Sequence, residues 1–245
     1  MSIDSELTRI ENAKSSLRTS LIAQGQSISA DDPIENYSYA VDNIPALKEY
    51  ENGYYVDENY KTFVKIKDKS VASFSLNSMT DTILGSAFWG ANNITALDFS
   101  NNSLLHVLCP SALAGLQGLT SIILPSGLKY IGQNAFSNCR ALTSITIPQD
   151  VLTIDYSFQN CTSLQSVTLK GATLITGMAF SSCSALTSIT IERNEVCELI
   201  SGGIPASASH HITVYVPSNL IASYQVATNW SDLYNNGYID FQAIA

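Results

Sequence analysis

Five cysteines are the side chains of this chain best suited to covalent or metal chemistry: Cys109, Cys139, Cys161, Cys183 and Cys197. The middle three each follow a phenylalanine by three positions, so they occupy one position of a repeat. Stacked repeats would place these thiols about 5 Å apart, but parallel Cβ directions do not converge as a disulfide requires. Zinc sites use C-x-x-C pairs with suitably spaced histidines, which this sequence lacks. The sequence therefore favours buried thiols that act as small apolar groups.

The three histidines, His106, His210 and His211, do not complete a reactive pair. His106 lies three positions before a cysteine, but the repeat pattern predicts Leu104 and Val107 in the core and His106 facing solvent. His210 and His211 are neighbours on a predicted strand, whose successive side chains face opposite ways. A shared metal site is therefore not expected at either place.

Carboxylates and nucleophiles are not grouped for catalysis. Asp150 and Asp155 are isolated in a nearly uncharged stretch, so they form no acid–base pair. The motifs G-x-S-x-G, H-E-x-x-H, Walker A and G-x-G-x-x-G do not occur in the sequence. The sequence thus predicts no catalytic residue, no cofactor and no metal, and a protein that is not an enzyme.

Charge is scarce and unevenly distributed. Charged residues make up 13 % of the chain, and 33 serines and 18 threonines supply much of its polarity. Residues 1–49 carry eight acids and four bases, whereas residues 94–191 carry three of each. A net charge of −9 disfavours nucleic acid as a partner. The sequence contains no run of about 18 apolar residues, so no membrane span is predicted. The opening MSIDSELTRIENAK has no basic segment followed by an apolar one, so no secretory signal is predicted.

The chain repeats itself every 22–25 residues, in units that start at residues 71, 94, 119, 142, 164 and 186 and end with HITVYVP at 211–217. Each unit opens L-x-x-L-x-L, whose last two apolar positions alternate as in a strand. A second apolar pair follows, such as Leu128 and Ile131, and then a small residue with an aromatic one, such as Ala135-Phe136. This pattern predicts a strand, a turn and a short helical or 3₁₀ return. No unit can bury its apolar stripe alone, so the units must stack.

The full motif, L-x-x-I-x-(I/L)-P-x-x-(V/L)-x-x-I-x-x-x-A-F-x-x-C, resembles the BspA-like subclass of leucine-rich repeats. The resemblance covers about residues 71–217, and Asn102 occupies the asparagine position of the general leucine-rich consensus. It implies an α+β repeat fold, a right-handed leucine-rich repeat solenoid with one parallel β-sheet, an N-terminal helical segment and a C-terminal helical cap. The class also implies cell-surface attachment and protein–protein interaction.

The segments outside the repeats are expected to close the ends of the stack. We expect a helical hairpin over residues 1–49, cap strands over 50–70, leucine-rich repeats over 71–216 and a C-terminal cap over 217–245. The segment VPSNLIASYQVATNWSDL after the last strand resembles the cap of the same family. The hairpin either caps the stack, docks the protein or oligomerises it, and residues 192–210 form an irregular insertion without an assigned role.

The third and fifth positions of each L-x-x-L-x-L opening face away from the core and define a candidate binding face. The residues of this predicted concave face are Asp98, Ser121, Ile123, Ser144, Thr146, Ser166, Thr168, Ser188 and Thr190. Serine and threonine also suit strands for structural reasons alone, because they pair across neighbouring strands. The functional interpretation is a neutral, hydrogen-bonding face for a protein or a glycan.

Two functions are compatible with these features. The first is a non-catalytic binding or adhesion protein at a cell surface, which recognises a protein or a host-surface ligand. The alternative is a structural or receptor-binding component of a phage-like particle, docked through residues 1–49. Neither involves nucleic acid or membrane insertion, and both leave the partner, the compartment and the oligomeric state open.

Overall fold

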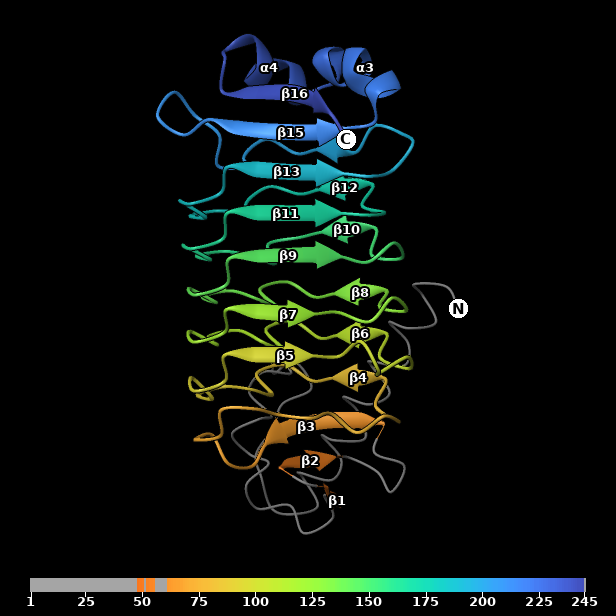
Figure 1. The fold of residues 1–245 in the computed structure, drawn as a ribbon, viewed down its shortest axis with the longest axis vertical. Coiled ribbons are helices and arrows are strands. Elements are labelled where there is room, and N and C mark those ends of the chain that lie inside the picture. The colour runs from red at the N-terminus through yellow and green to blue at the C-terminus, as the bar shows by residue number, and fades with distance from the viewer. Residues whose placement is uncertain (1–47, 51, 56–60, 245) are drawn as a thin grey trace, which may run out of the picture.

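The computed structural model describes residues 48–50, 52–55 and 61–244, which form an elongated stack of short strands (Figure 1). The predicted helical hairpin lies outside the described residues, except for its last two, which belong to β1 (Lys48–Tyr50). Two rows of strands run along the stack. They are called here the main row and the second row.

The main row is built from the L-x-x-L-x-L openings. Its strands are β5 (Ala96–Asp98), β7 (Ser121–Ile123), β9 (Ser144–Ile147), β11 (Ser166–Leu169), β13 (Ser188–Ile191), β15 (Ile212–Val216) and β16 (Ile239–Ala243). β5 and β7 form one parallel pair, and β9, β11, β13, β15 and β16 form one parallel sheet in that order. The predicted parallel-strand solenoid is thus confirmed.

The prediction of a single sheet is wrong, because the second apolar pair of each unit also forms a strand. The second row contains β4 (Thr82–Ile83), β6 (Val107–Leu108), β8 (Tyr130–Ile131), β10 (Thr153–Ile154), β12 (Leu174–Ile175) and β14 (Glu198–Leu199). β4 continues into β3 (Thr62–Ile66), β2 (Gly53–Tyr55) and β1, the last two pairs being antiparallel. Stacking places each two-residue segment beside the corresponding segment of the next unit, so even two residues form a ladder.

The predicted helical or 3₁₀ return is also wrong, since tight turns carry the chain back in the described repeats. A residue with positive φ stands directly before each small–aromatic pair, and before the corresponding Ala112-Leu113 in the unit from residue 94: Ser86, Ser111, Asn134, Tyr156 and Met178. A left-handed residue interrupts a right-handed helical turn, so a helix cannot propagate there. The turns still form a third row, in which Phe136 N donates to Ser157 O and Phe158 N donates to Ala179 O, both at 2.9 Å.

The core runs along the axis of the stack. The rings of Phe136, Phe158 and Phe180 lie face to face, with centroids 5.0 and 5.3 Å apart. Leu104 was predicted in the core but is 40 % exposed, and its neighbour Leu105 is buried instead. The unit that starts at residue 94 has 25 residues, and its second apolar pair, Leu105 and Leu108, lies two positions further along the unit than Leu128 and Ile131 do in the next one.

The first repeat forms no main-row strand within its described residues 71–80, although Phe74 and Leu76 are buried. The Asn102 side chain donates instead to the carbonyls of Leu76 and Asn77, at 3.4 and 3.1 Å. These carbonyls are therefore satisfied by a side chain where later repeats use strand pairing. Phe63, Phe74 and Phe88 pack together at this end with centroids 5.0–5.1 Å apart.

The other end carries a longer connection and three short helical segments. Residues 192–210 are not wholly irregular, because they contribute β14 and the buried Cys197 and Leu199. The helical segments η3 (Ser218–Leu220), α3 (Ile221–Val226) and α4 (Trp230–Asn235) lie between β15 and β16 in the chain and beside β16 in Figure 1. Trp230 and Tyr224 are buried there.

Candidate functional site

All nine residues predicted for the open face lie on the outer side of the main row. They are exposed or half-buried, while the residues between them, such as Ile145 and Val167, are buried. The register sets them in columns: Ser144, Ser166, Ser188 and Thr213 form one, and Thr146, Thr168, Thr190 and Tyr215 form the other. On the other pair of strands, Ala96 aligns with Ser121, and Asp98 aligns with Ile123. We call this surface the open face.

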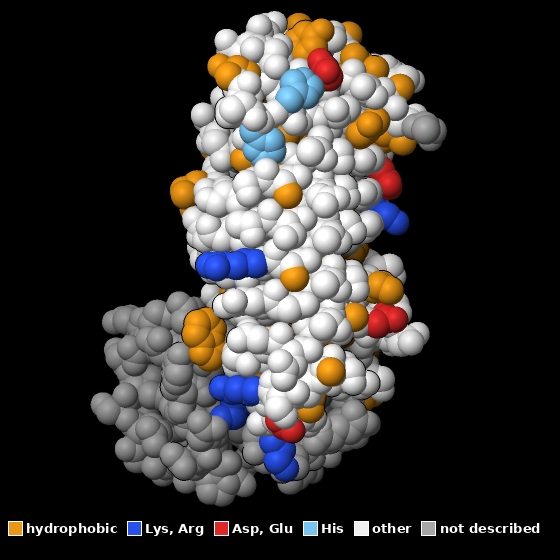
Figure 2. All heavy atoms as spheres, turned by 60° about the vertical axis from the view of Figure 1, so that its left-hand side comes forward, with side chains coloured by type: hydrophobic (Ala, Val, Ile, Leu, Met, Phe, Trp, Pro, Cys, Tyr) orange, Lys and Arg blue, Asp and Glu red, His pale blue; other side chains and the backbone are white. Residues whose placement is uncertain are grey.

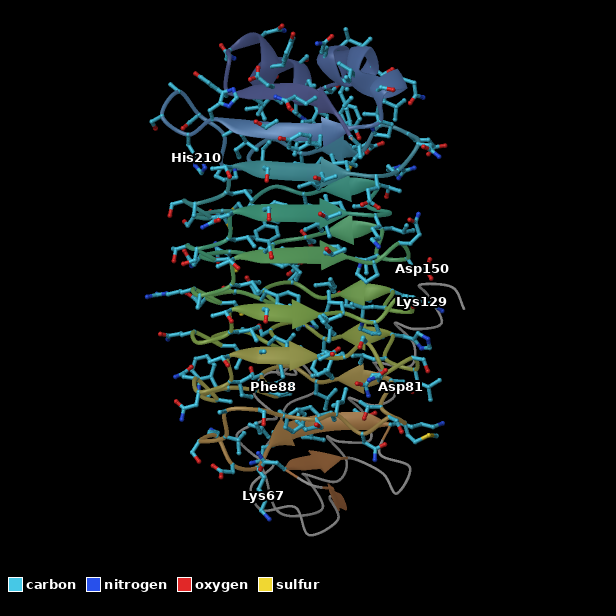
Figure 3. The ribbon with its side chains drawn as sticks, in the orientation of Figure 1. Lys67, Asp81, Phe88, Lys129, Asp150 and His210 are labelled. Carbon is cyan, nitrogen blue, oxygen red and sulfur yellow. The ribbon has the colours of Figure 1, made fainter. Side chains whose placement is uncertain are left out.

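The open face carries little charge. Figure 2 shows a mostly uncharged surface over the repeats with isolated basic and acidic side chains, and Figure 3 shows Lys129 and Asp150 at an edge of the stack. Asp98 is the acidic residue of the predicted set. Hydrogen bonds from the Ser100 hydroxyl and backbone N–H lower the pKa of Asp98 below its ordinary value.

Both strand rows are interrupted at the same level of the stack. β7 is not paired with β9, and β8 is not paired with β10, so the strands divide into two blocks. A long hydrogen bond of 3.4 Å from Thr143 N to Thr120 O remains at the start of the main-row strands. The turn row is continuous across the interruption, through the Phe136–Ser157 bond described above. Figure 1 shows the wider spacing between β7 and β9.

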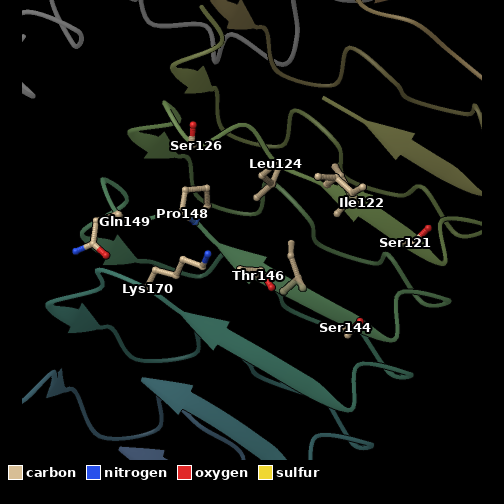
Figure 4. A pocket seen from close by; sticks show the side chains of 11 residues that line it. Ser121, Ile122, Leu124, Ser126, Ser144, Thr146, Pro148, Gln149 and Lys170 are labelled. Atoms are coloured by element: carbon tan, nitrogen blue, oxygen red, sulfur yellow. The ribbon is translucent and has the colours of Figure 1, made fainter. Parts of the chain in front are cut away.

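The interruption opens a cleft of about 480 Å³ between β7 and β9, called here the β7–β9 cleft (Figure 4). It is lined by Ser121, Ile122, Ile123, Leu124, Ser126, Ser144, Ile145, Thr146, Pro148, Gln149 and Lys170. Four of these, Ser121, Ile123, Ser144 and Thr146, were predicted as face residues. Isoleucine and leucine side chains form its apolar part, hydroxyls lie at its rim, and Lys170 is its only charged lining residue.

A proline borders the interruption, although a proline also borders a paired level of the stack. At the position after the strand, Lys170 N donates to Ile147 O at 3.1 Å and Glu192 N donates to Leu169 O at 2.9 Å. Pro148 after β9 occupies the same repeat position and has no N–H to donate, but so does Pro125 after β7, and β7 still pairs with β5. Sequence reasoning missed Lys170 and Gln149 as lining residues. Because Pro125 at this position does not separate β7 from β5, the proline by itself does not indicate the cleft, and the sequence carries no separate signal for these two residues.

The five cysteines are free and buried, and for Cys139, Cys161 and Cys183 this is the environment that their shared repeat position predicts. The thiols of Cys139, Cys161 and Cys183 each donate to a main-chain carbonyl of the preceding repeat, at 3.3, 3.1 and 3.0 Å. Burial raises the pKa of Cys139 and Cys197 to about 12. The hydrogen bond with Cys183, together with burial, raises the pKa of Cys161. These thiols therefore satisfy backbone carbonyls and fill the core.

We expect the thiols to be unreactive while the chain is folded. A pKa near 12 for Cys139 and Cys197 lowers the thiolate fraction at pH 8 by about a thousandfold relative to a free cysteine. In 5,5′-dithiobis(2-nitrobenzoate) assays, the native protein should release almost no chromophore, whereas the protein in 6 M guanidinium should titrate five thiols. Prompt reaction of even one thiol in the native protein would contradict this assignment.

The histidines are held individually. His210 Nε2 lies 2.5 Å from Leu186 O, and His211 Nε2 lies 3.4 Å from Asp240 Oδ2. His106 is half-buried, where the sequence predicted a solvent-facing side chain. In the part of the chain that the structure describes, no group of three or more His, Cys, Asp or Glu could hold a metal ion. None of the helices among the described residues has both the length and the apolar character needed to span a membrane.

Stacked parallel strands, one per unit, with buried leucines and a phenylalanine row define a leucine-rich repeat solenoid. Residues 81–202 match the model of the family described as BspA type Leucine rich repeat region, in six copies. This part of the chain is therefore a BspA-type leucine-rich repeat region, as the motif predicted. No curated protein matches the chain in sequence.

Two solved structures of bacterial proteins show the same fold. The pneumococcal vaccine antigen PcpA is 16 % identical with a TM-score of 0.65, over 83 % of this chain and 49 % of the antigen. A leucine rich cell surface protein from Faecalibacterium prausnitzii A2-165 is 19 % identical with a TM-score of 0.54, over 60 % of this chain and 40 % of that protein. This chain thus spans half or less of each, and the likeness concerns the fold.

Proposed function

We propose that the protein is a non-catalytic binding protein that recognises another protein through the open face, at a bacterial cell surface. The observation that carries the proposal is the register of the face. Two columns of short hydroxyl side chains run across β9, β11 and β13 without a charged residue. Such a surface offers hydrogen bonds at regular spacing and costs less to desolvate than a charged surface, provided that its hydroxyls regain hydrogen bonds with the partner.

Two further observations support this proposal. Repeat solenoids commonly bind partners along the extended face that their strands form. One of the similar structures is, by its printed name, a cell surface protein, and the other is a vaccine antigen. Ile123 adds an apolar side chain to the face that is 54 % exposed, more than packing of the stack requires.

The test is to place an arginine on the open face. The purified chain is screened against arrays of extracellular proteins and of glycans, and each binder is remeasured with Ser144→Arg and Thr168→Arg. We expect a loss of at least tenfold in affinity, because the long cation occupies the face and is desolvated on binding. The melting temperature should change little for Ser144→Arg, since Ser144 is exposed.

Ser184→Arg is the matched control. Ser184 is also exposed but lies in a turn before β13, outside the columns, so its replacement should leave binding unchanged. Equal binding by all three variants would refute the role of the open face. Binders found on the glycan array alone would replace the protein partner with a carbohydrate.

We also propose that residues 217–245 cap the C-terminal end of the stack. In the repeats, the next unit supplies the backbone donors for the second row, as when Glu198 N donates to Thr173 O at 2.7 Å. Beyond β14, side chains supply them: Trp230 Nε1 donates to Cys197 O at 2.7 Å, and Asn229 Nδ2 donates to Leu199 O at 2.6 Å. Such side chains would end the ladder without leaving an open edge.

A further inference from the structure

The β7–β9 cleft reaches the core of the stack. Ile122 and Leu124 are 7 and 9 % exposed, whereas the corresponding Val167 and Leu169 on β11 are at most 1 % exposed. The cleft volume of about 480 Å³ lies within the usual range for sites that bind small groups. A large apolar side chain of a partner could therefore pack against apolar side chains in the cleft, as anchor residues pack into pockets at protein interfaces.

Polar groups of the cleft are placed to hold a main chain. β7 and β9 each lack a strand neighbour on the side of the cleft, so their backbone edges face it without a paired ladder. The hydroxyls of Ser121, Ser144 and Thr146 stand along the same edges. An extended peptide can use such edges and hydroxyls for hydrogen bonds while its side chain enters the cleft.

Lys170 determines the charge that the occupant should carry. Its side chain runs beside Pro148 toward Thr146 (Figure 4), and it makes no ion pair with a residue that the structure describes. Among the described residues, no carboxylate lines the cleft itself, although Glu192 and Glu195 line a neighbouring hollow that Lys170 also borders. A carboxylate on the occupant would therefore complement the only charge of the site.

We propose that the β7–β9 cleft binds an extended segment of a partner protein that carries a large apolar side chain next to a carboxylate. The apolar side chain lies against Ile122, Leu124 and Ile145, and the carboxylate pairs with Lys170. This inference deepens the proposed function and rests on it, since the cleft is part of the open face.

The test uses the full chain with ¹³C-labelled isoleucine methyl groups and the peptide Ac-Gly-Phe-Asp-Gly-NH₂ as the probe. We expect saturable shifts of the Ile122, Ile123 and Ile145 methyl resonances, with an affinity in the millimolar range that is usual for so small a ligand. The peptides with Phe→Ala or Asp→Asn should each bind at least threefold more weakly. Lys170→Gln should weaken the Asp peptide to the level of the Asn peptide and leave the Asn peptide unchanged.

Thr146→Glu and Thr168→Glu form a matched pair of variants, because both residues stand in one column but only Thr146 lines the cleft. Thr146→Glu should reduce binding of the Asp peptide at least fivefold, and Thr168→Glu should change it less than twofold. Absent methyl shifts, equal binding of the Ala peptide, or equal effects of the two variants would overturn the cleft assignment. If the array binders remain sensitive to Ser144→Arg and Thr168→Arg in that case, the open-face proposal stands and only the cleft assignment fails.

Discussion

Replacing Phe158 with alanine should lower the free energy of unfolding by about 3–5 kcal/mol. Phe158 is fully buried, and its ring lies between those of Phe136 and Phe180 at nearly parallel angles of 8 and 10°. Truncation removes both stacking contacts and leaves a cavity that the backbone hydrogen bonds of the turn row prevent from closing. For a chain of this length, the melting temperature should fall by roughly 6–20 °C.

The position of Phe158 gives this variant a second expected effect. Both strand rows are interrupted between β7 and β9 and between β8 and β10, so the two blocks are joined by core packing, which includes the Phe136–Phe158 contact, and by the turn row. Stability in repeat proteins depends on such neighbour contacts. Chemical denaturation of Phe158→Ala should therefore show two transitions where the unmodified chain shows one.

Phe158→Leu and Trp89→Ala are the controls for this experiment. Leucine retains most of the volume, so the first should cost less than about 1.5 kcal/mol. Trp89 is 51 % exposed, and its removal should change the free energy of unfolding by about 0.5 kcal/mol or less. A loss below about 1 kcal/mol for Phe158→Ala would contradict a packed phenylalanine row.

Trp230→Ala should have an effect of similar size at the C-terminal end, about 3–5 kcal/mol. Trp230 is fully buried and packs edge-on against Tyr224 with ring centroids 5.5 Å apart. Its loss also leaves the buried Cys197 carbonyl without the indole donor, and an unsatisfied buried carbonyl costs about 1–3 kcal/mol by itself. Thermal unfolding followed by circular dichroism measures the change.

Trp230→Phe separates the two contributions. The smaller ring fills part of the cavity but cannot donate to Cys197 O, so we expect a loss between those of the unmodified chain and of Trp230→Ala. Hydrogen exchange should locate the effect, because opening of the end would deprotect the amides of β14, β15 and β16 before those of β9. If Trp230→Ala left those amides protected, residues 217–245 would not act as a cap.

Some features of the fold follow from single repeat units. The L-x-x-L-x-L opening alternates buried and exposed residues, so Ile145 and Val167 had to face the core and Ser144 and Ser166 had to face outward. The recurring Phe-x-x-Cys likewise placed the cysteines in one buried row. The shift from Leu104 to Leu105 was not predictable, because the two extra residues of that unit can be accommodated in more than one way.

The sequence by itself therefore determined the stack, its buried rows and the residues of the open face, since the apolar period inside each unit decides which side of the chain is buried. Only the tertiary structure decided that the units separate between β7 and β9 and that Lys170 lines the resulting cleft. The openings on its two sides, LTSIILP and LTSITIP, are nearly identical, so neither unit alone indicates a gap. The cleft depends on how one unit lies on the next, because Pro125 and Pro148 both lack the donor that Lys170 and Glu192 supply, yet only the strands β7 and β9 separate.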